Sequence, residues 1–279
     1  MTIWQVDFYR RPLQDDQGQP LWELVLCSPD KTFAAYGVCP QAEAKAAWVV
    51  EQLQQLGQSS PWPERIEVFR PQCLSLLQTV GDRLQIPVVA TRHTSALKQY
   101  LHDRAQIYPT LPQYNRQPYD PLALESPPPV PVPDELWGDR WRFATVTAGD
   151  WDAFFQDKPI PVRDTAPSLH PLHLQLASST PIPGVVIDGG RQSMRLSRWL
   201  QDQQPVALNY IPGHPDGLIL EVGLCDRLIL ATFNDSDVQT AASTYQQRLT
   251  ASNGLHFLLI QPDDSGMTYS GLWWLRPER

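Results

Sequence analysis

Proline is concentrated in the middle of this chain of 279 residues. Nine of its 28 prolines lie within 109–133, and the stretch ends with the run PPPVPVP at 127–133. Proline lacks a backbone N–H and has a fixed φ, so it is excluded from helix interiors and central strands. We therefore predict an extended linker at 109–133 with polyproline II character, between a domain at 1–108 and a domain at 134–279. A ligand for an SH3-like module is the alternative, but low charge and the central position favour a spacer.

The first domain is predicted to alternate strands and helices. Residues 3–9 alternate in polarity, with Trp4, Val6 and Phe8 on one face of a strand. Proline, glycine and apolar spacing predict further strands at 21–27, 32–38, 65–69 and 87–90, and helices at 40–56, 72–84 and 95–104. The order is three strands, then helix, strand, helix, strand and helix, which resembles the ribonuclease H-like fold.

The second domain is predicted to be a mixed-sheet α/β domain. Its expected strands lie at 141–146, 184–187, 206–211, 217–222, 227–233, 255–260 and 269–275, and its helices at 148–155, 193–203 and 237–250. A hairpin turn is expected at 223–226. The predicted class of the whole chain is therefore α/β, with α+β mixed sheets.

The charge of the chain limits how it can bind nucleic acid. With 22 basic and 30 acidic residues, the net charge is −8, which excludes a protein that coats nucleic acid non-specifically. Eighteen of the basic residues are arginines, the side chain suited to bidentate phosphate contacts. Residues 134–279 carry 11 basic and 17 acidic side chains, so an RNA site there would be an island of positive charge. Such a site predicts position-specific binding.

Other sequence signals argue against membrane, secreted and cofactor-dependent classes. No apolar run approaches the roughly 20 residues that a membrane span needs. The N-terminus has no signal-peptide pattern. The four cysteines form no CxxC pair, which favours free thiols in a reducing cytoplasm. Nucleotide-binding and hydrolase motifs are absent, and the pair His170 and His173 lacks further ligands at zinc spacing, so no cofactor and no metal are predicted.

The strongest candidate site is a segment that combines a glycine turn with three arginines. Gly189 and Gly190 precede an expected helix on which Arg191, Arg195 and Arg198 follow i, i+4 and i+7 spacing. A helix N-terminus after a glycine turn is a natural anion site. The segment therefore predicts a cradle for an RNA backbone.

This segment has an alternative interpretation, and the chain offers a second cationic position. The alternative is a solvated helix face whose arginines pair with Asp188 and Asp202, and both interpretations remain open. Arg10 and Arg11, which leave the first strand, form a second cationic point where aromatic side chains could stack on unpaired bases.

A nuclease is a further possibility, because the first domain has a nuclease-like order. Asp7 lies mid-strand where a first metal-binding carboxylate is expected, and Glu43 or Glu51 would follow from the helix. The fourth strand, however, ends in Arg70, a cation in place of a carboxylate. The simpler interpretation is that Asp7 pairs with an arginine such as Arg10 or Arg70.

Several segments together resemble one protein family. The opening run TIWQVDFYRRP, which contains Asp7, resembles the first motif of the Tab/Atab family of oxygenic phototrophs. The terminal run GLWWL resembles its last motif, although the family's usual Trp-Leu-Leu is here Trp273, Trp274 and Leu275. Further similar segments lie at 21–24, 182–184, 189–191, 199–200 and 216–227.

The resemblance implies a function. Plastid members of that family are RNA-binding translation activators for photosystem reaction-centre subunits, notably the B subunit of photosystem I. It therefore implies a non-enzymatic protein that binds A/U-rich, single-stranded reaction-centre mRNA, with translation or photosystem assembly factors as further partners. The absence of a transit peptide fits a cytoplasmic cyanobacterial member. We expect phosphates on Arg191, Arg195, Arg198, Arg10 and Arg11.

Two other functions remain as alternatives. In a protein-interaction scaffold, Trp273, Trp274 and the proline-rich arm would dock partners. In a metal-dependent nuclease, Asp7 would be essential. Trp273 and Trp274 can also be explained as core residues, because a terminal strand rich in aromatic side chains is commonly packed.

Overall fold

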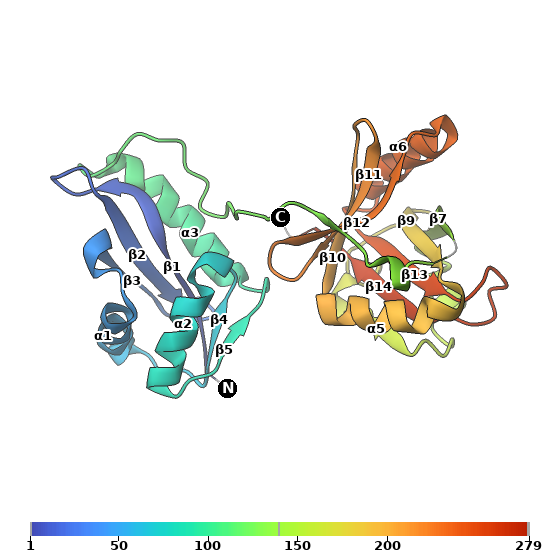
Figure 1. Cartoon of the computed structure of the whole chain (residues 1–279). Helices are drawn as coiled ribbons and strands as arrows, with labels where there is room; N and C mark the ends of the chain where they lie inside the picture. Colours follow the sequence, from blue (N-terminus) through green and yellow to red (C-terminus); the bar gives the residue numbers. More distant parts are fainter. Residues whose placement is uncertain (1, 139, 278–279) are drawn as a thin grey trace. The chain divides into compact units, whose positions relative to one another are not determined.

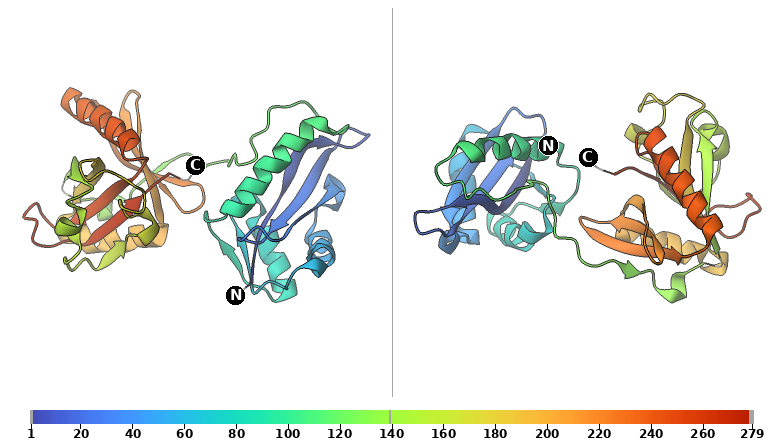
Figure 2. Two further views of the ribbon diagram at one scale, coloured as in Figure 1. Left: turned by 180° about the vertical axis from the view of Figure 1, so that it is seen from behind. Right: turned by 90° about the horizontal axis from the view of Figure 1, so that it is seen from above.

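The chain forms two compact units, Met1–Glu125 and Ser126–Arg279 (Figures 1 and 2). The computed structural model describes residues 2–138 and 140–277, with Ser59 described by its backbone alone. The division between the units falls within the proline-rich stretch. Strands and helices are mixed in both units, which confirms the predicted α/β class with mixed sheets.

Unit 1 contains one five-stranded sheet in the order β3-β2-β1-β4-β5. Its strands are β1 (Ile3–Gln14), β2 (Pro20–Cys27), β3 (Ala34–Pro40), β4 (Arg65–Val68) and β5 (Val88–Ala90). Its helices are α1 (Ala46–Leu56), α2 (Pro71–Leu84) and α3 (Ser95–Ile107). Strands β1, β2 and β3 are antiparallel neighbours, whereas β4 and β5 run parallel to β1. The carboxyl ends of β4 and β5 therefore lie at the same end of the sheet, beside the second half of β1.

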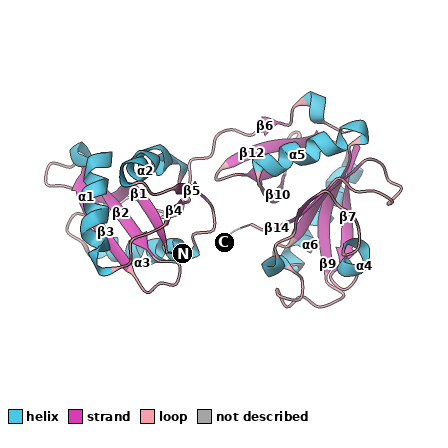
Figure 3. Ribbon diagram, turned by 90° about the horizontal axis from the view of Figure 1, so that it is seen from below, coloured by secondary structure: helices cyan, strands magenta, loops and turns pink. Residues whose placement is uncertain are grey.

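The two faces of this sheet are covered by different helices (Figure 3). Trp4, Val6 and Phe8 alternate along β1 and pack in one cluster with residues of α1 and α2. Asp7 lies between them in the sequence and therefore points to the opposite face. That face is covered by α3, whose Leu101 packs in a second cluster. Asp7 is fully buried there, so its charge requires partners within the protein.

Residues 109–125, the first half of the predicted linker, pack against unit 1. We call this segment the strap. The backbone of Gln14 donates to the carbonyl of Gln113 at 2.8 Å, which fixes the strap beside the end of β1. Leu122 and Leu124 pack on the apolar cluster beneath α3. In place of a free spacer, this half of the stretch is a packed part of unit 1.

Unit 2 contains two sheets, with the orders β10-β11-β12-β6 and β7-β9-β13-β14-β8. Its strands are β6 (Val130–Pro131), β7 (Arg140–Thr147), β8 (Val162–Asp164), β9 (Pro181–Asp188), β10 (Pro205–Ile211), β11 (Asp216–Val222), β12 (Asp226–Phe233), β13 (His256–Gln261) and β14 (Gly271–Leu275). Its helices are α4 (Trp151–Phe155), α5 (Ser193–Gln203) and α6 (Ser236–Ala251). Among the residues that the structure describes, no helix is long and apolar enough to cross a membrane.

The proline-rich stretch also supplies a strand of unit 2. Val130 pairs with Leu228 of β12 in a parallel arrangement, and the backbone N–H of Val132 donates to the carbonyl of Ile229. The second half of the predicted linker therefore belongs to a sheet of unit 2. Its neighbour β12 forms, with β11, the hairpin that the sequence predicts at 223–226.

The main core of unit 2 lies between its two sheets. It combines Leu196 and Leu200 of α5 with Tyr245 of α6, and it contains residues of both sheets such as Leu208 and Leu258. A second cluster, which includes Trp151 and Phe155 of α4, covers the other face of the five-stranded sheet. The apolar side of α5 is thus fixed to the core, and the orientation of its remaining side chains follows from that.

Candidate nucleic-acid interface

A tight glycine turn positions the amino end of α5. The N–H of Gly189 donates to the carbonyl of Gln261, and Gly190 adopts a positive φ of 51°. A Cβ atom on Gly189 would lie 2.7 Å from Cα of Ser193, so a larger residue would push the helix away. A short 3-10 turn, Gly190–Gln192, then leads into α5.

The three predicted arginines all lie on the solvent side of this segment. Arg191 is exposed in the 3-10 turn, and Arg195 and Arg198 are exposed on α5. Arg195 donates from Nη1 to the side-chain carbonyl of Gln192 at 3.1 Å. In the described parts of the chain, the structure contains no ion pair of these three guanidinium groups. Their charge therefore remains available to an anion from solution.

The alternative interpretation, in which these arginines pair with Asp188, is not what the structure shows. Asp188 ends β9 with its carboxylate buried, and it accepts hydrogen bonds from Arg140, from Arg142 at 2.8 Å and from Gln261 at 2.8 Å. Burial opposes ionisation, but the hydrogen bonds from Arg140, Gln261 and Arg142 hold the pKa of Asp188 below its ordinary value. This carboxylate is therefore bound by side chains of β7 and β13 and does not pair with the arginines of α5. Asp202 is exposed on α5.

The two arginines at the end of β1 have opposite environments. Arg10 is 62% exposed, and its Nη2 lies 3.7 Å from a carboxylate oxygen of Glu125. Arg11 has no accessible side-chain surface. The prediction that Arg11 contacts RNA is therefore corrected, because its guanidinium is enclosed and bound within unit 1.

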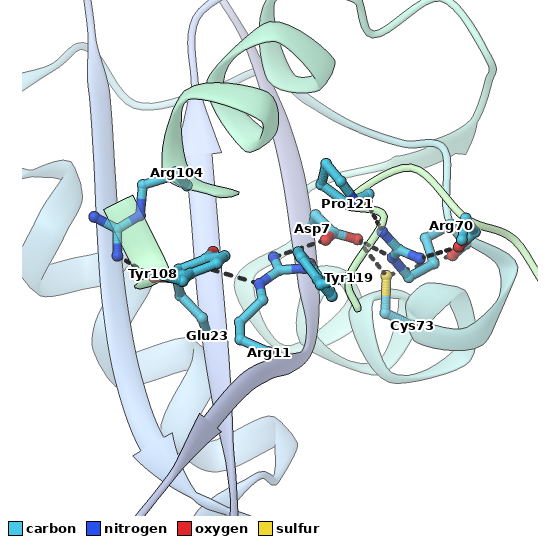
Figure 4. A network of polar contacts seen from close by, with 10 residues as sticks. Asp7, Arg11, Glu23, Arg70, Cys73, Arg104, Tyr108, Tyr119 and Pro121 are labelled. Carbon is cyan, nitrogen blue, oxygen red and sulfur yellow. Dashed lines mark hydrogen bonds and ion pairs between the residues drawn. The ribbon is translucent and has the colours of Figure 1, made fainter. Parts of the chain in front are cut away.

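Arg11 belongs to a buried network of charges (Figure 4). Its Nη2 donates to Asp7 at 2.8 Å, its Nε donates to Glu23 at 3.1 Å, and its Nη1 donates to the hydroxyl of Tyr119 at 3.0 Å. Burial alone would lower the pKa of Arg11, but Asp7 and the other acidic groups around it raise that pKa. Arg11 is therefore a fixed cation that holds β1, β2 and the strap together.

The carboxylate that a nuclease would use to bind a metal ion, Asp7, is bound within the same network. Arg70 donates from Nε to Oδ1 of Asp7 at 2.8 Å, so both oxygens of Asp7 accept from guanidinium groups. Arg70 was one of the two partners considered for Asp7, and the other, Arg10, faces solvent. Glu43 and Glu51 are exposed. Within residues 2–138 and 140–277, no three His, Cys, Asp or Glu side chains are grouped so that they could hold a metal ion.

The carboxylate of Glu23 is the second centre of this network. Arg104 and Tyr108, at the end of α3, both donate to it. Burial raises the pKa of Tyr108, so its hydroxyl stays protonated and remains a donor. Sequence reasoning missed this carboxylate, whose only sequence signal is an acidic residue within an otherwise apolar strand.

The terminal motif is part of the core. Trp273 and Leu275 are each 1% exposed and pack in the main core, whereas Trp274 is 7% exposed and packs on the opposite face with α4. Gly271 permits this packing, because a Cβ atom there would lie 2.6 Å from the indole of Trp273. Of the two interpretations of these tryptophans, the structure supports packing.

These features define a class of protein: a two-unit, mixed α/β protein with a buried ionic core in one unit and an exposed arginine-bearing helix in the other. Comparison with family models gives the particular family. Residues 3–104 match the N-terminal model and residues 119–276 the C-terminal model of the RNA-binding protein Tab2/Atab2 family. The chain belongs to this family.

Curated relatives agree with the family models. The chain is 26% identical over 283 residues to the chloroplastic TAB2 homolog of Arabidopsis thaliana, with 98% of this chain and 74% of the relative covered. It is also 26% identical over 280 residues to the chloroplastic TAB2 homolog of Zea mays, with 98% and 70% covered.

Solved structures show only weak similarity. The catalytic core domain of HTLV-2 integrase in complex with magnesium matches with a TM-score of 0.27 and 15% identity. The match covers 40% of this chain and 77% of the integrase chain. A score this low does not identify a common fold.

Proposed function

We propose that this chain is a non-enzymatic RNA-binding protein that supports photosystem biogenesis, especially that of photosystem I, through translation of reaction-centre mRNA. Membership of the Tab2/Atab2 family supports the RNA-binding part, and the chloroplastic TAB2 homologs support the link to photosynthesis. The observation that carries the site is the exposed set of arginines at the amino end of α5: Arg191 in the turn and Arg195 and Arg198 on the helix lie without ion pairs among the described residues.

The RNA in this proposal is single-stranded and A/U-rich. Guanidinium groups bind phosphate oxygens in a bidentate way, and unpaired bases stack on aromatic side chains. The excess of acidic residues in 134–279 repels RNA elsewhere on the unit, which favours binding at one position. Translation or photosystem assembly factors are the further partners, and the cytoplasm of a cyanobacterium is the proposed location.

We also infer that unit 1 is ribonuclease H-like and has lost the ability to cleave. The strand order β3-β2-β1-β4-β5, with three antiparallel strands followed by two parallel ones, supports this inference. Both carboxylate oxygens of Asp7 accept hydrogen bonds from Arg11 and Arg70, which supports the loss of cleavage. Labelled RNA should stay intact with the protein and Mg²⁺ or Mn²⁺. A cleavage activity that Asp7→Asn abolishes would favour the nuclease instead.

The scaffold alternative is less well supported. It uses Trp273 and Trp274 as docking residues, and both indoles are buried. The proline-rich arm, its other docking element, is held to unit 1 by the strap and to β12 by the backbone of the exposed strand β6.

Fluorescence anisotropy with a labelled, unstructured A/U-rich RNA tests the proposed function. The triple variant R191E/R195E/R198E should bind at least about tenfold more weakly at physiological salt, with a smaller slope of log K against log salt. The matched control is K45E/R83E/K158E, which changes three other exposed cations by the same charge. Equal affinity of both variants would contradict the site, and a wild-type protein that fails to bind would contradict the function.

A further inference from the structure

Cations and aromatic rings alternate across one edge of the sheet in unit 1. Lys98 Nζ lies 5.7 Å from the ring centre of Phe69, and Arg70 Cζ lies 5.1 Å from the same ring. Arg70 Cζ also lies 4.4 Å from the ring of Tyr9, and Arg10 Cζ lies 5.7 Å from that ring. We call these five residues the cation–aromatic row. Each contact is within cation–π range, so the row has a defined geometry.

The row lies where strands of like direction end. Phe69 and Arg70 directly follow β4, Tyr9 and Arg10 belong to the second half of β1, and Lys98 lies in the first turn of α3, shortly after β5. In open α/β sheets, ligands bind outside the carboxyl ends of the parallel strands. The topology therefore brings these side chains to the edge where such sheets bind ligands.

The middle of the row is fixed by the protein itself. Arg70 is 1% exposed and donates to Asp7 and to the carbonyls of Pro121 and Ala123 in the strap. Phe69 is also buried. These residues cannot reach a ligand, but they hold the side chains at both ends of the row in place.

The two ends of the row are the parts that can meet an anion. Arg10 is 62% exposed, and its pair with the 74% exposed Glu125 at 3.7 Å is of the weak, surface kind. A phosphate can therefore replace Glu125. At the other end, Lys98 is half-buried and donates from Nζ to the carbonyl of Arg92, so it adjoins a loop that also carries the exposed His93.

We propose that this edge of unit 1 is a second contact site for the phosphodiester backbone of RNA, with Arg10 at one end of the row and Lys98 at the other. Arg10 exchanges Glu125 for a phosphate, and the buried side chains of Phe69 and Arg70, with the half-buried ring of Tyr9, keep the two ends at a fixed spacing. This inference rests on the proposed function and adds a site that is separate from α5.

Anisotropy titrations of a labelled oligouridylate against the full chain test the site. Arg10→Gln with Lys98→Gln should weaken binding about tenfold and reduce the salt slope by about 1.4, because two phosphate contacts are lost. The matched control is Lys45→Gln with Arg83→Gln, which removes two exposed charges of unit 1 that lie outside the row. The control should keep the wild-type affinity and slope.

A crosslink gives a second readout that does not depend on a variant. Oligonucleotides with 4-thiouridine should crosslink to peptides that contain 9–11 or 92–98. If the variant R10Q/K98Q binds like wild type while R191E/R195E/R198E binds weakly, the second site is overturned and the proposed function stands. Crosslinks confined to unit 2 would overturn it equally, and a wild-type chain that binds no RNA would overturn both.

Discussion

Arg70 donates its Nε–H to Oδ1 of Asp7 across 2.8 Å, and neither side chain is more than 2% exposed. The pair joins β1 to the segment after β4 at the position where a two-metal nuclease would need free carboxylate oxygens. A charge so deeply buried is tolerated only with a full set of partners, and Arg11 supplies the second guanidinium. The same contact therefore stabilises unit 1 and closes its acidic position to metal ions.

Removal of Arg70 should destabilise the protein strongly. Arg70→Met leaves the buried Asp7 with Arg11 as its one charged partner, and a loss of about 3–5 kcal/mol in the free energy of unfolding is expected. Urea denaturation followed by tryptophan fluorescence measures it. Arg10→Met makes the same substitution at an exposed site and should leave the midpoint unchanged. Similar midpoints for both variants would contradict the role assigned to the network.

The strap should contribute to stability through one hydroxyl. Tyr119→Phe removes the acceptor for Nη1 of Arg11, and leaves a buried, charged donor unpaired. A loss of about 1–3 kcal/mol is expected from thermal or urea unfolding. Tyr114→Phe is the matched control, because its hydroxyl makes an exposed hydrogen bond to Gln117 within the same segment. A control variant as unstable as Tyr119→Phe would argue against a specific role of the network.

His256 should make the protein sensitive to acid. Its Nε2 accepts from the N–H of Leu208 at 2.7 Å, its Nδ1 faces the carbonyl of Gly254, and burial lowers its pKa to about 4. The unfolded chain binds this proton below about pH 6.5, so stability is full above that pH and falls as the pH drops toward 4, by about 3 kcal/mol in all.

A glutamine variant isolates this contribution. His256→Gln keeps an acceptor for Leu208, and its urea midpoint should depend less on pH between 6.5 and 4 than that of wild type. His102→Gln, at an exposed position on α3, should retain the wild-type pH dependence. Parallel pH profiles of wild type and His256→Gln would show that other groups carry the acid sensitivity.

The two tryptophans of β14 should respond differently to leucine. Trp273→Leu opens a cavity in the main core and should cost about 2–4 kcal/mol. Trp274→Leu also removes volume, but it removes a buried indole N–H that has no partner, so its cost should be smaller. Denaturation curves of the two variants give the order, and a larger loss for Trp274→Leu would reverse this account.

Local pattern was sufficient to place the arginines of α5. The spacing of Arg191, Arg195 and Arg198 puts them opposite Leu196 and Leu200, which are fully buried. Helical periodicity depends only on neighbouring residues, so it is readable from the sequence.

The environment of Arg11 was not readable in this way. Arg10 and Arg11 are adjacent and chemically identical, and one is exposed while the other is enclosed. The difference arises from Tyr119, more than a hundred residues away, and from the fold of the strap. The prolines of the strap indicate a segment with few backbone N–H donors. Its backbone carbonyls can still accept hydrogen bonds, and the carbonyl of Pro121 accepts one from Arg70. Long-range pairing of this kind has no local sequence signal.

The short strand β6 also affects how copies of the chain meet. Val132 donates to β12, so the alternate residue, Pro131, directs its backbone nitrogen outward, where no N–H exists. An open sheet edge normally offers donors on which a second chain can build another strand. With Pro129, Pro131 and Pro133 at alternate positions, this border offers none. The proline-rich stretch therefore leaves this edge of the four-stranded sheet without N–H donors, which disfavours the addition of a strand from a second chain there.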